Sequence, residues 1–360
     1  MGCVSTKPGS CWFLAVEEDS ILKSSNSIEC FNDIQTSFPI KESLAPSFEP
    51  SHFDYPFFPI STELLDKDFP LFNYSSKELV QYAMEMLKQF DTNSRCLFTL
   101  LDLIRNNYFS FVPFHNFWHG FAVAQSLYSI GERNEKYSRY LHGKEYFYLL
   151  LSGLGHDLCH PGLNNSFLIA TKNELTVKYN NESVLENHHA SVLIRLVEKS
   201  QILTDMEFEY ARKIFLECIL STDMAKHKDT EEKFENTMQS YSVKNRQHRV
   251  NFMSFVLHSA DLGNQTVNFP LAVLWSLRLC REFNQQCSQE EKIGITVSDH
   301  LHLGRDITKI KNSQVGFIKS IIMPMWINLS NHLDDLDDHI RTLQQNQKKW
   351  AELKSFETFS

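Results

Sequence analysis

The sequence predicts an all-α protein, and three features carry that prediction. Only 12 Gly and 11 Pro occur among the 360 residues, so the turn residues that punctuate a hairpin-rich β fold are scarce. Capping-box patterns precede stretches whose apolar residues recur at helical spacing. A further stretch, residues 250–260, is apolar nearly all round, which is typical of a helix buried on every side.

Two predicted helices begin at capping boxes. Ser75 stands three residues before Glu78, and apolar residues then recur at helical spacing through residues 79–87. Thr204 and Glu207 repeat the pattern before residues 208–219. Both patterns supply a side-chain acceptor for the free N–H groups of a helix start, so we expect helices to begin there.

The chain divides into a tether and one domain. Residues 1–55 are rich in Ser, Pro and scattered aromatic residues and show no sustained period, which predicts a disordered tether. We see no internal repeat, and residues 60–350 contain no linker-like stretch, so we expect a single helical domain over residues 56–360. A hydrophobic content of 42% is ample for its core.

Charge and cysteine content exclude several classes of protein. The formal net charge of -9 argues against nucleic acid as a partner. A phosphate-ester substrate would need a local positive site such as metal ions, because the overall field repels it. The eight cysteines include no CxxC pair, which suits a reducing compartment.

The N-terminus predicts attachment to a membrane surface. No apolar run approaches the roughly 18 residues that span a bilayer. Residues 1–6, however, read MGCVST, which fits the pattern for myristoylation of Gly2, with Cys3 available for palmitoylation. One acyl chain binds only marginally and Lys7 is the only basic residue before Lys23, so we expect both chains to anchor the protein on the cytosolic face. The alternative is a chance match at an ordinary disordered start.

Residues 115–119, HNFWH, form the first candidate metal pair. His115 and His119 are four apart, so we expect them to share one face of a helix, where two imidazoles could bind a metal. Since the chain has 15 histidines, chance pairing explains this spacing equally well when it is seen alone.

Two further positions place polar groups at the ends of apolar helices. His156 and Asp157 follow the apolar run 146–154, and we expect Pro161 and Gly162 to end that helix just after them. Asp261 stands at the exit of the run 250–260. Such groups are costly to bury unless they are paired or bind a metal. A hydrogen-bonded helix end is the alternative for His156 and Asp157.

Taken together, these residues form a mixed imidazole and carboxylate set. His119, His156, Asp157 and Asp261 would suit Zn²⁺ or another borderline divalent ion and leave positions open for water. Asp157 could also bridge to a second ion such as Mg²⁺ or Mn²⁺. Two ions held in this way would clamp a phosphoryl group and hold a hydroxide between them.

These motifs resemble the class I cyclic-nucleotide phosphodiesterases, whose signatures are HNxxH and HDxDHPG. The likeness covers roughly residues 60–350 and continues through ELTVKYN (174–180), SVLENHH (183–189), STDMAKH (221–227) and SQVGFI (313–318). The resemblance implies a compact multi-helix domain of the HD-like type. It also implies hydrolysis of 3′,5′-cyclic nucleotides to 5′-nucleoside monophosphates.

The resemblance also implies roles for individual residues. The tightly bound metal would be held by His119, His156, Asp157 and Asp261, with Asp157 shared by the second ion. A hydroxide held by the two ions would attack phosphorus, and His115 would donate a proton to the leaving O3′. Residues implied to hold water or orient the histidines are His160, Glu186 and Thr222. Residues implied to contact the base are Asn264, Leu279, Gln314 and Phe317.

Two positions depart from the family pattern. Cys159 stands where the family has Asp, so a strong hydrogen-bond acceptor is replaced by a weak one. Phe114 stands where many members have Tyr. We expect His188 and His189 to be structural, because the metal set is complete without them.

Alternatives to the phosphodiesterase stay open, and so does the choice of nucleotide. An HD-type phosphohydrolase acting on noncyclic nucleotides would share the His–Asp pair, and an inactive membrane-tethered nucleotide-binding module would suit Cys159. Gln314 can satisfy either purine edge. Ala272 and the likeness of HNFWH and ELTVKYN to the high-affinity cGMP-specific subfamily favour cGMP over cAMP.

Overall fold

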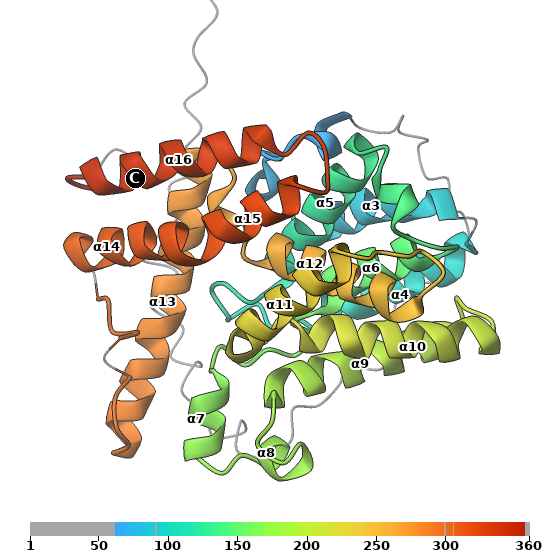
Figure 1. Cartoon of the computed structure of the whole chain (residues 1–360). Coiled ribbons are helices and arrows are strands. Elements are labelled where there is room, and N and C mark those ends of the chain that lie inside the picture. Colours follow the sequence, from blue (N-terminus) through green and yellow to red (C-terminus); the bar gives the residue numbers. More distant parts are fainter. Residues whose placement is uncertain (1–61, 91, 299, 305, 357–360) are drawn as a thin grey trace, which may run out of the picture.

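The computed structural model describes residues 62–90, 92–298, 300–304 and 306–356 (Figure 1). Every regular element in these ranges is helical and none is a strand, so the predicted all-α class is confirmed. The α-helices are α3 (Ser76–Leu87), α4 (Ser94–Asn106), α5 (Phe117–Arg133), α6 (Glu145–Gly155), α7 (Asn165–Ala170), α8 (Glu174–Lys178), α9 (Val184–Ser200), α10 (Asp205–Leu220), α11 (His227–Met238), α12 (Arg246–Asp261), α13 (Phe269–Ile293), α14 (Ile307–Phe317), α15 (Met323–Ser330) and α16 (Asp337–Glu352).

Short tight helices connect several of these elements. The 3₁₀ turns are η3 (Thr62–Leu65), η4 (Leu71–Asn73), η5 (Lys88–Phe90), η6 (Tyr137–Arg139), η7 (Met224–Lys226) and η8 (Gly263–Gln265). The remaining short element, η9 (Ile318–Ile322), is a π-helical segment between α14 and α15. Such π-helical turns are uncommon and often lie at functional sites.

Both predicted capping boxes are present. The Ser75 hydroxyl accepts a hydrogen bond from the Glu78 N–H, and the Glu78 carboxylate accepts one from the Ser75 N–H at 2.7 Å. Thr204 and Glu207 make the same reciprocal pair at the start of α10. Each box satisfies donors that a helix start otherwise leaves free, so both helices begin where the sequence predicts.

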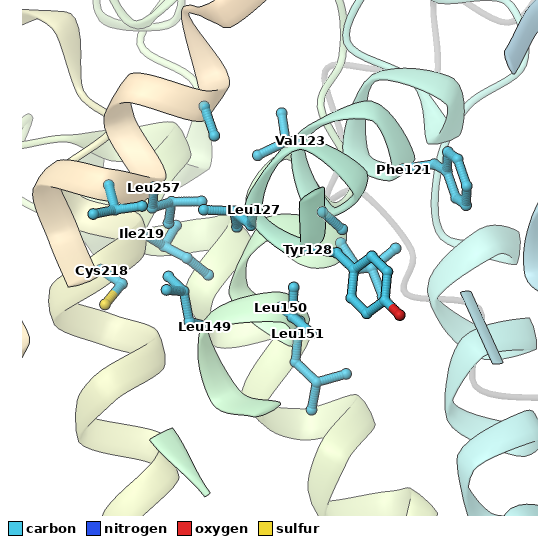
Figure 2. Packing of buried hydrophobic residues seen from close by; sticks show 14 of the residues in the cluster. Phe121, Val123, Leu127, Tyr128, Leu149, Leu150, Leu151, Cys218, Ile219 and Leu257 are labelled. Carbon is cyan, nitrogen blue, oxygen red and sulfur yellow. The ribbon is translucent and has the colours of Figure 1, made fainter. Parts of the chain in front are cut away.

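The core is built around α5, α6, α10 and α12, which pack against one another. Figure 2 shows Leu127 of α5, Leu149 of α6, Ile219 of α10 and Leu257 of α12 near one another in this core. Residues 252–260 of α12 are all buried, as the apolar run predicts. Helices α5 and α12, which carry His119 and Asp261, and α6, which ends just before His156, are therefore held from several sides.

A glycine lets two of these helices approach closely. A Cβ atom on Gly120 would lie 2.6 Å from the Tyr108 hydroxyl and 2.9 Å from the Leu154 carbonyl oxygen. The Tyr108 hydroxyl donates a hydrogen bond to that same carbonyl at 3.0 Å. Only glycine therefore fits where α5 crosses the end of α6. Gly120 directly follows His119, and Leu154 lies two residues before His156, so this crossing brings the two histidines together.

The C-terminal helices cover one side of the molecule. In Figure 1, α13 runs down the left edge, and α14, α15 and α16 lie together at the upper left. Helix α16 packs against α14, α15 and η8. None of the helices described here is both long and apolar enough to cross a bilayer.

The predicted tether and its boundary at residue 55 lie outside the described residues, and so do Gly2 and Cys3. The disorder of residues 1–55, their acylation and the attachment to a cytosolic membrane face therefore stay predictions.

We expect Gly120→Ala to lower the free energy of unfolding by about 1–3 kcal/mol, because the methyl group would overlap backbone as well as the Tyr108 side chain. Gly316→Ala is the matched control, since Gly316 also lies in a helix but has no heavy atom within 4 Å of an added Cβ. Alanine favours a helix interior over glycine by roughly 1 kcal/mol, so the control should be neutral or stabilising. Urea unfolding measures both, and equal losses would contradict the close approach.

Candidate active site

His115 lies just before α5 rather than on it. The Asn116 side chain accepts a hydrogen bond from the Trp118 N–H at 3.0 Å, and the Asn116 backbone is extended, so α5 begins at Phe117. Our expectation that His115 and His119 share one helix face is therefore wrong. The physical reason is that asparagine is a strong N-cap, which ends the helix between the two histidines. Their ring centroids still lie 5.8 Å apart.

The turn after α6 also differs from its prediction. Helix α6 ends at Gly155, and the chain turns through residues 156–160, where Cys159 takes a left-handed conformation with φ of 61°. The Cys159 N–H donates a hydrogen bond to the Asn107 carbonyl at 2.8 Å. Pro161 and Gly162 therefore follow a turn that has already ended the helix. His156 and Asp157 stand at the very start of that turn.

Four side chains from α5, α12 and the turn after α6 converge. His119 Nε2 lies 3.0 Å from Asp261 Oδ1 and 3.2 Å from His156 Nε2. His156 Nε2 lies 3.1 Å from Asp261 Oδ1 and 3.1 Å from Asp157 Oδ2. The ligand atoms of these four residues all lie within 4.8 Å of one another. The structure thus brings together the whole set that we predicted as metal ligands.

The donors in this group fit a divalent cation. The Nδ1 of His156 donates a hydrogen bond to the Gly153 carbonyl at 2.9 Å, which leaves the Nε2 lone pair directed into the group. Asp157 Oδ2 is buried and has no hydrogen-bond partner among the residues described. Two imidazole nitrogens beside two carboxylates make a donor set for Zn²⁺ or a related ion.

The carboxylates of the group are held in their charged form. Burial alone would raise the pKa of Asp157, but the charges of His156 and His115 lower it well below its usual range. Burial opposes ionisation of Asp261 in the same way, yet His156 and His119 lower its pKa too. Both carboxylates are therefore ionised and can serve as anionic ligands to a cation.

Glu282 on α13 is a candidate site residue that the sequence prediction missed. One of its carboxylate oxygens accepts hydrogen bonds from the N–H groups of Phe114 at 2.9 Å and His115 at 3.1 Å, and the other contacts His115 Nδ1. Burial lowers the pKa of His115, but the negative charges of Glu282, Asp157 and Asp261, together with the hydrogen bond to Glu282, outweigh it and raise that pKa to about 9. The sequence signal for this residue was its spacing. Glu282 lies three residues after Leu279 and seven after Trp275, which places an acid on the inner face of α13.

His160 and His189 lie on the other side of Asp157. The ring of His160 stacks on that of His115 with centroids 4.0 Å apart. His189 Nδ1 donates to the Leu158 carbonyl at 2.6 Å, and its Nε2 lies 3.8 Å from Asp157 Oδ1. Asp157, His160 and His189 form a second group that could hold an ion. The sequence analysis predicts a structural role for His189, whereas the structure places its Nε2 atom close to Asp157.

Glu186 and Thr222 have local partners in the structure. The Glu186 carboxylate accepts a hydrogen bond from Asn165 Nδ2 at 3.0 Å, and burial, followed by the charge of Asp223, raises its pKa to about 7. The Thr222 hydroxyl donates to the Ile219 carbonyl at 2.8 Å, so its proton points back to the end of α10 rather than to a histidine.

The four residues predicted to contact a base lie on elements that meet near η8. Asn264 belongs to η8, which contacts α13, the helix of Leu279, and η9, which follows Gln314 and Phe317. The Asn264 amide donates to the Asp261 carbonyl at 3.4 Å, which ties this region to the His–Asp group. The Gln314 side chain is 6% exposed, and its amide has no hydrogen-bond partner in the described part of the chain.

Both departures from the family pattern are buried. The ring of Phe114 packs 4.6 Å from that of His119 and 5.4 Å from that of Trp275, so it supports a candidate ligand by apolar contact. Cys159 is fully buried, and its Sγ lies 3.8 Å from Asn107 Oδ1.

The described helices bring together a His–Asp group that could hold a metal ion, which defines a helical protein with a candidate metal site. The family model described as 3′,5′-cyclic nucleotide phosphodiesterase matches residues 114–343. The chain belongs to this family.

Similar proteins carry the same description. The cGMP-specific 3′,5′-cGMP phosphodiesterase 3 of Dictyostelium discoideum is 28% identical over 272 residues, which cover 74% of this chain and 58% of that protein. The human high affinity cGMP-specific 3′,5′-cyclic phosphodiesterase 9A is 29% identical over 78% of this chain and 48% of its own. This chain therefore spans about half the length of these curated relatives.

A solved structure supports the fold. The phosphodiesterase domain of the RhoPDE fusion protein from the choanoflagellate Salpingoeca rosetta superposes with a TM-score of 0.74 at 29% identity. The match covers 81% of this chain and 96% of that one.

We expect purified protein to retain a divalent metal through dialysis and Asp261→Asn to lose most of it, because the change removes a charged ligand without changing its shape. Asp223→Asn is the control, since Asp223 is also buried but accepts its hydrogen bond from the Ser183 hydroxyl at 2.7 Å. Elemental analysis gives the metal content. Equal retention by wild type and Asp261→Asn would remove Asp261 from the ligand set.

Proposed function

We propose that this chain hydrolyses 3′,5′-cyclic nucleotides to 5′-nucleoside monophosphates. The observation that carries the proposal is the placement of His115, which is hydrogen-bonded to Glu282, beside the His–Asp group. The membership of the chain in the phosphodiesterase family supports it. The group offers ligands for a cation, and His115 offers a proton at the same place. Metal-assisted phosphodiester hydrolysis with a general acid uses both.

The residues around Asp157 support a site for two cations. Asp157 belongs both to the group with His119 and His156 and to the group with His160 and His189. We propose Zn²⁺ for the first group, with its two imidazoles and two carboxylates, and Mg²⁺ or Mn²⁺ for the second position. When bound, such ions supply a hydroxide nucleophile at neutral pH and neutralise the charge that develops on the phosphoryl group.

His115 is proposed as the proton donor to the leaving oxygen. Its pKa of about 9 keeps the ring protonated at neutral pH. Glu282 engages Nδ1 and also accepts hydrogen bonds from two backbone N–H groups, so it fixes the ring and leaves Nε2–H to donate. As the P–O3′ bond breaks, that proton moves to O3′ and the oxygen of water becomes bonded to phosphorus.

Recognition of the base is assigned to the region near η8. The amide of Gln314, which has no hydrogen-bond partner among the described residues, can present both a donor and an acceptor to a purine edge, and Phe317, three residues later on α14, an aromatic face. Leu279 and Asn264 complete the proposed contacts. We propose cGMP as the preferred substrate, which the names of the two curated relatives support.

The proposal predicts measurable turnover of cyclic nucleotides. Purified protein should convert cGMP to 5′-GMP with a higher kcat/KM than it shows for cAMP. A chelator should abolish both reactions and added divalent metal should restore them, because water is too weak an acid at neutral pH without metal. Parallel assays of cGMP, cAMP and a noncyclic nucleotide monophosphate distinguish the alternatives. Turnover of the noncyclic ester alone would indicate an HD-type phosphohydrolase, and no turnover an inactive binding module.

The pH profile tests the pairing of His115 with Glu282. In the wild type, kcat should fall as the pH rises through about 9, because the acid is active only while protonated. Glu282→Gln should shift this falling limb toward the ordinary histidine pKa of about 6.5, since it removes the charge that raises the pKa. His115→Ala should lower kcat by roughly 10²–10⁴ and leave bound metal intact.

Glu290→Gln is the matched control for this pH experiment. Glu290 lies on the same helix, is also buried and accepts hydrogen bonds from Ser298 and Gln286. Its replacement should leave the falling limb where it is. An unshifted limb in Glu282→Gln would show that Glu282 does not set the acidity of His115.

A further inference from the structure

We infer that helix α16 positions the nucleotide-base site by holding the η8 turn through Gln265, Trp350 and Asn346. The inference rests on the proposed function, because it concerns the affinity of that site for its nucleotide. The printed hydrogen bonds of these three residues join them to one another and to the turn rather than to the His–Asp group, so they would act through the turn that they hold.

Gln265 lies at the centre of a buried hydrogen-bond network. Its Nε2 donates to the Ser276 hydroxyl at 2.8 Å and its Oε1 accepts from the Trp350 indole N–H at 2.8 Å. The Ser276 hydroxyl in turn donates to the Ala272 carbonyl at 2.8 Å. Gln265, Ser276 and Trp350 are each at most 3% exposed, so water cannot replace these partners without rearrangement.

The chemistry of the partners fixes which way the Gln265 amide points. An indole N–H can only donate, so the oxygen of the amide must face Trp350. The Ser276 hydroxyl donates its proton to the Ala272 carbonyl, so it can only accept a hydrogen bond from Gln265 Nε2. The side chain therefore joins α16 on one side to α13 on the other in a single orientation.

Asn346 adds a second attachment to the same turn. Its Nδ2 donates to the backbone carbonyls of Gln265 at 2.9 Å and Val267 at 2.7 Å, and the residue is 1% exposed. Asn346 and Trp350 are four residues apart on α16, so they present one face to the turn. Together they hold both its backbone and its central side chain.

The turn that α16 holds connects the two parts of the proposed site. Asn264 lies in η8 and donates to the Asp261 carbonyl. Helix α16 also packs against α14, which carries Gln314 and Phe317, and Lys311 of α14 donates to the last carbonyls of α16. One helix thus sets the spacing between Asn264 and the residues on α14.

The metal ligands do not depend on α16 in the same way. His119 lies on α5, His156 follows α6, and Asp261 ends α12, whose surroundings bury it along most of its length. A small displacement of η8 should therefore change how the base is held more than it changes the chemical step. This separation predicts an effect on KM with little effect on kcat.

Trp350→Phe tests the inference, because it removes the indole donor and keeps an aromatic ring. We expect KM for cGMP to rise roughly three- to tenfold, the range for one lost buried hydrogen bond, while kcat and metal content stay within about twofold. Turnover of bis(4-nitrophenyl) phosphate, which has no purine, should not change. Loss of kcat and of metal together with the rise in KM would overturn the inference.

Trp326→Phe is the matched control. Trp326 is fully buried and lies against the same turn, 3.3 Å from where a Cβ of Gly263 would stand, but its indole N–H has no partner among the residues described. The control loses the same volume without losing a hydrogen bond. An equal rise in KM in both variants would assign the effect to packing and contradict the role of the Trp350 donor.

A second pair of variants covers the case in which Trp350→Phe fails to fold. Asn346→Asp keeps the shape of the side chain but removes both donors to the turn, and Gln345→Glu adds the same charge at the neighbouring exposed position of α16. We expect a rise in KM of roughly three- to tenfold for Asn346→Asp alone. Equal KM values for the two variants would overturn the inference.

Hydrogen exchange separates this inference from the proposed function. Amides of residues 263–267 should exchange faster in Trp350→Phe and Asn346→Asp than in their controls, whether or not the protein turns over a nucleotide. Absent turnover in the wild type would contradict the proposed function and leave this measurement valid. Unchanged exchange at the turn would contradict the positioning role of α16.

Discussion

The structure depends on the burial of two ionised carboxylates, Asp157 and Asp261, beside two imidazoles. Charges in a protein interior are tolerated only when they are paired at close range, so the segments that carry them have to meet within about 3 Å. Gly120 permits the close crossing of α5 and α6, and the buried surroundings of α12 hold Asp261 in place. Much of the helical core serves as the frame for this contact.

The proposed acid is supported differently from the proposed ligands. His119 lies inside a helix, whereas His115 lies on the segment before it, where Glu282 of α13 holds both its backbone and its ring. A ligand needs a fixed position, and a proton donor also needs a neighbouring charge that keeps it protonated. The site therefore joins α5, α12 and the turn after α6 to α13.

Local patterns made part of this predictable from the sequence. The capping boxes at Ser75 and Thr204 and the buried helix before Asp261 depend on neighbours in the chain, and the structure has them as predicted. Glu282 and the free ring edge of His189 depend on helices that meet only after folding, and the sequence analysis did not find them. The prediction that His115 shares a helix face with His119 was wrong, because a spacing of four residues does not show where a helix begins. Asn116, a common N-cap residue, was the sequence signal for that boundary. The attachment of α16 to η8 is likewise a long-range contact without a local motif.

Anomalous diffraction from crystals of the protein, recorded at a metal absorption edge, tests the central claim most directly. The account predicts a peak bonded to His119 Nε2, His156 Nε2 and carboxylate oxygens of Asp157 and Asp261 at about 2.0–2.2 Å. A second ion is expected beside Asp157 toward His160 and His189. Crystals of an active sample with no metal at these residues, or with metal bound only elsewhere, would contradict it.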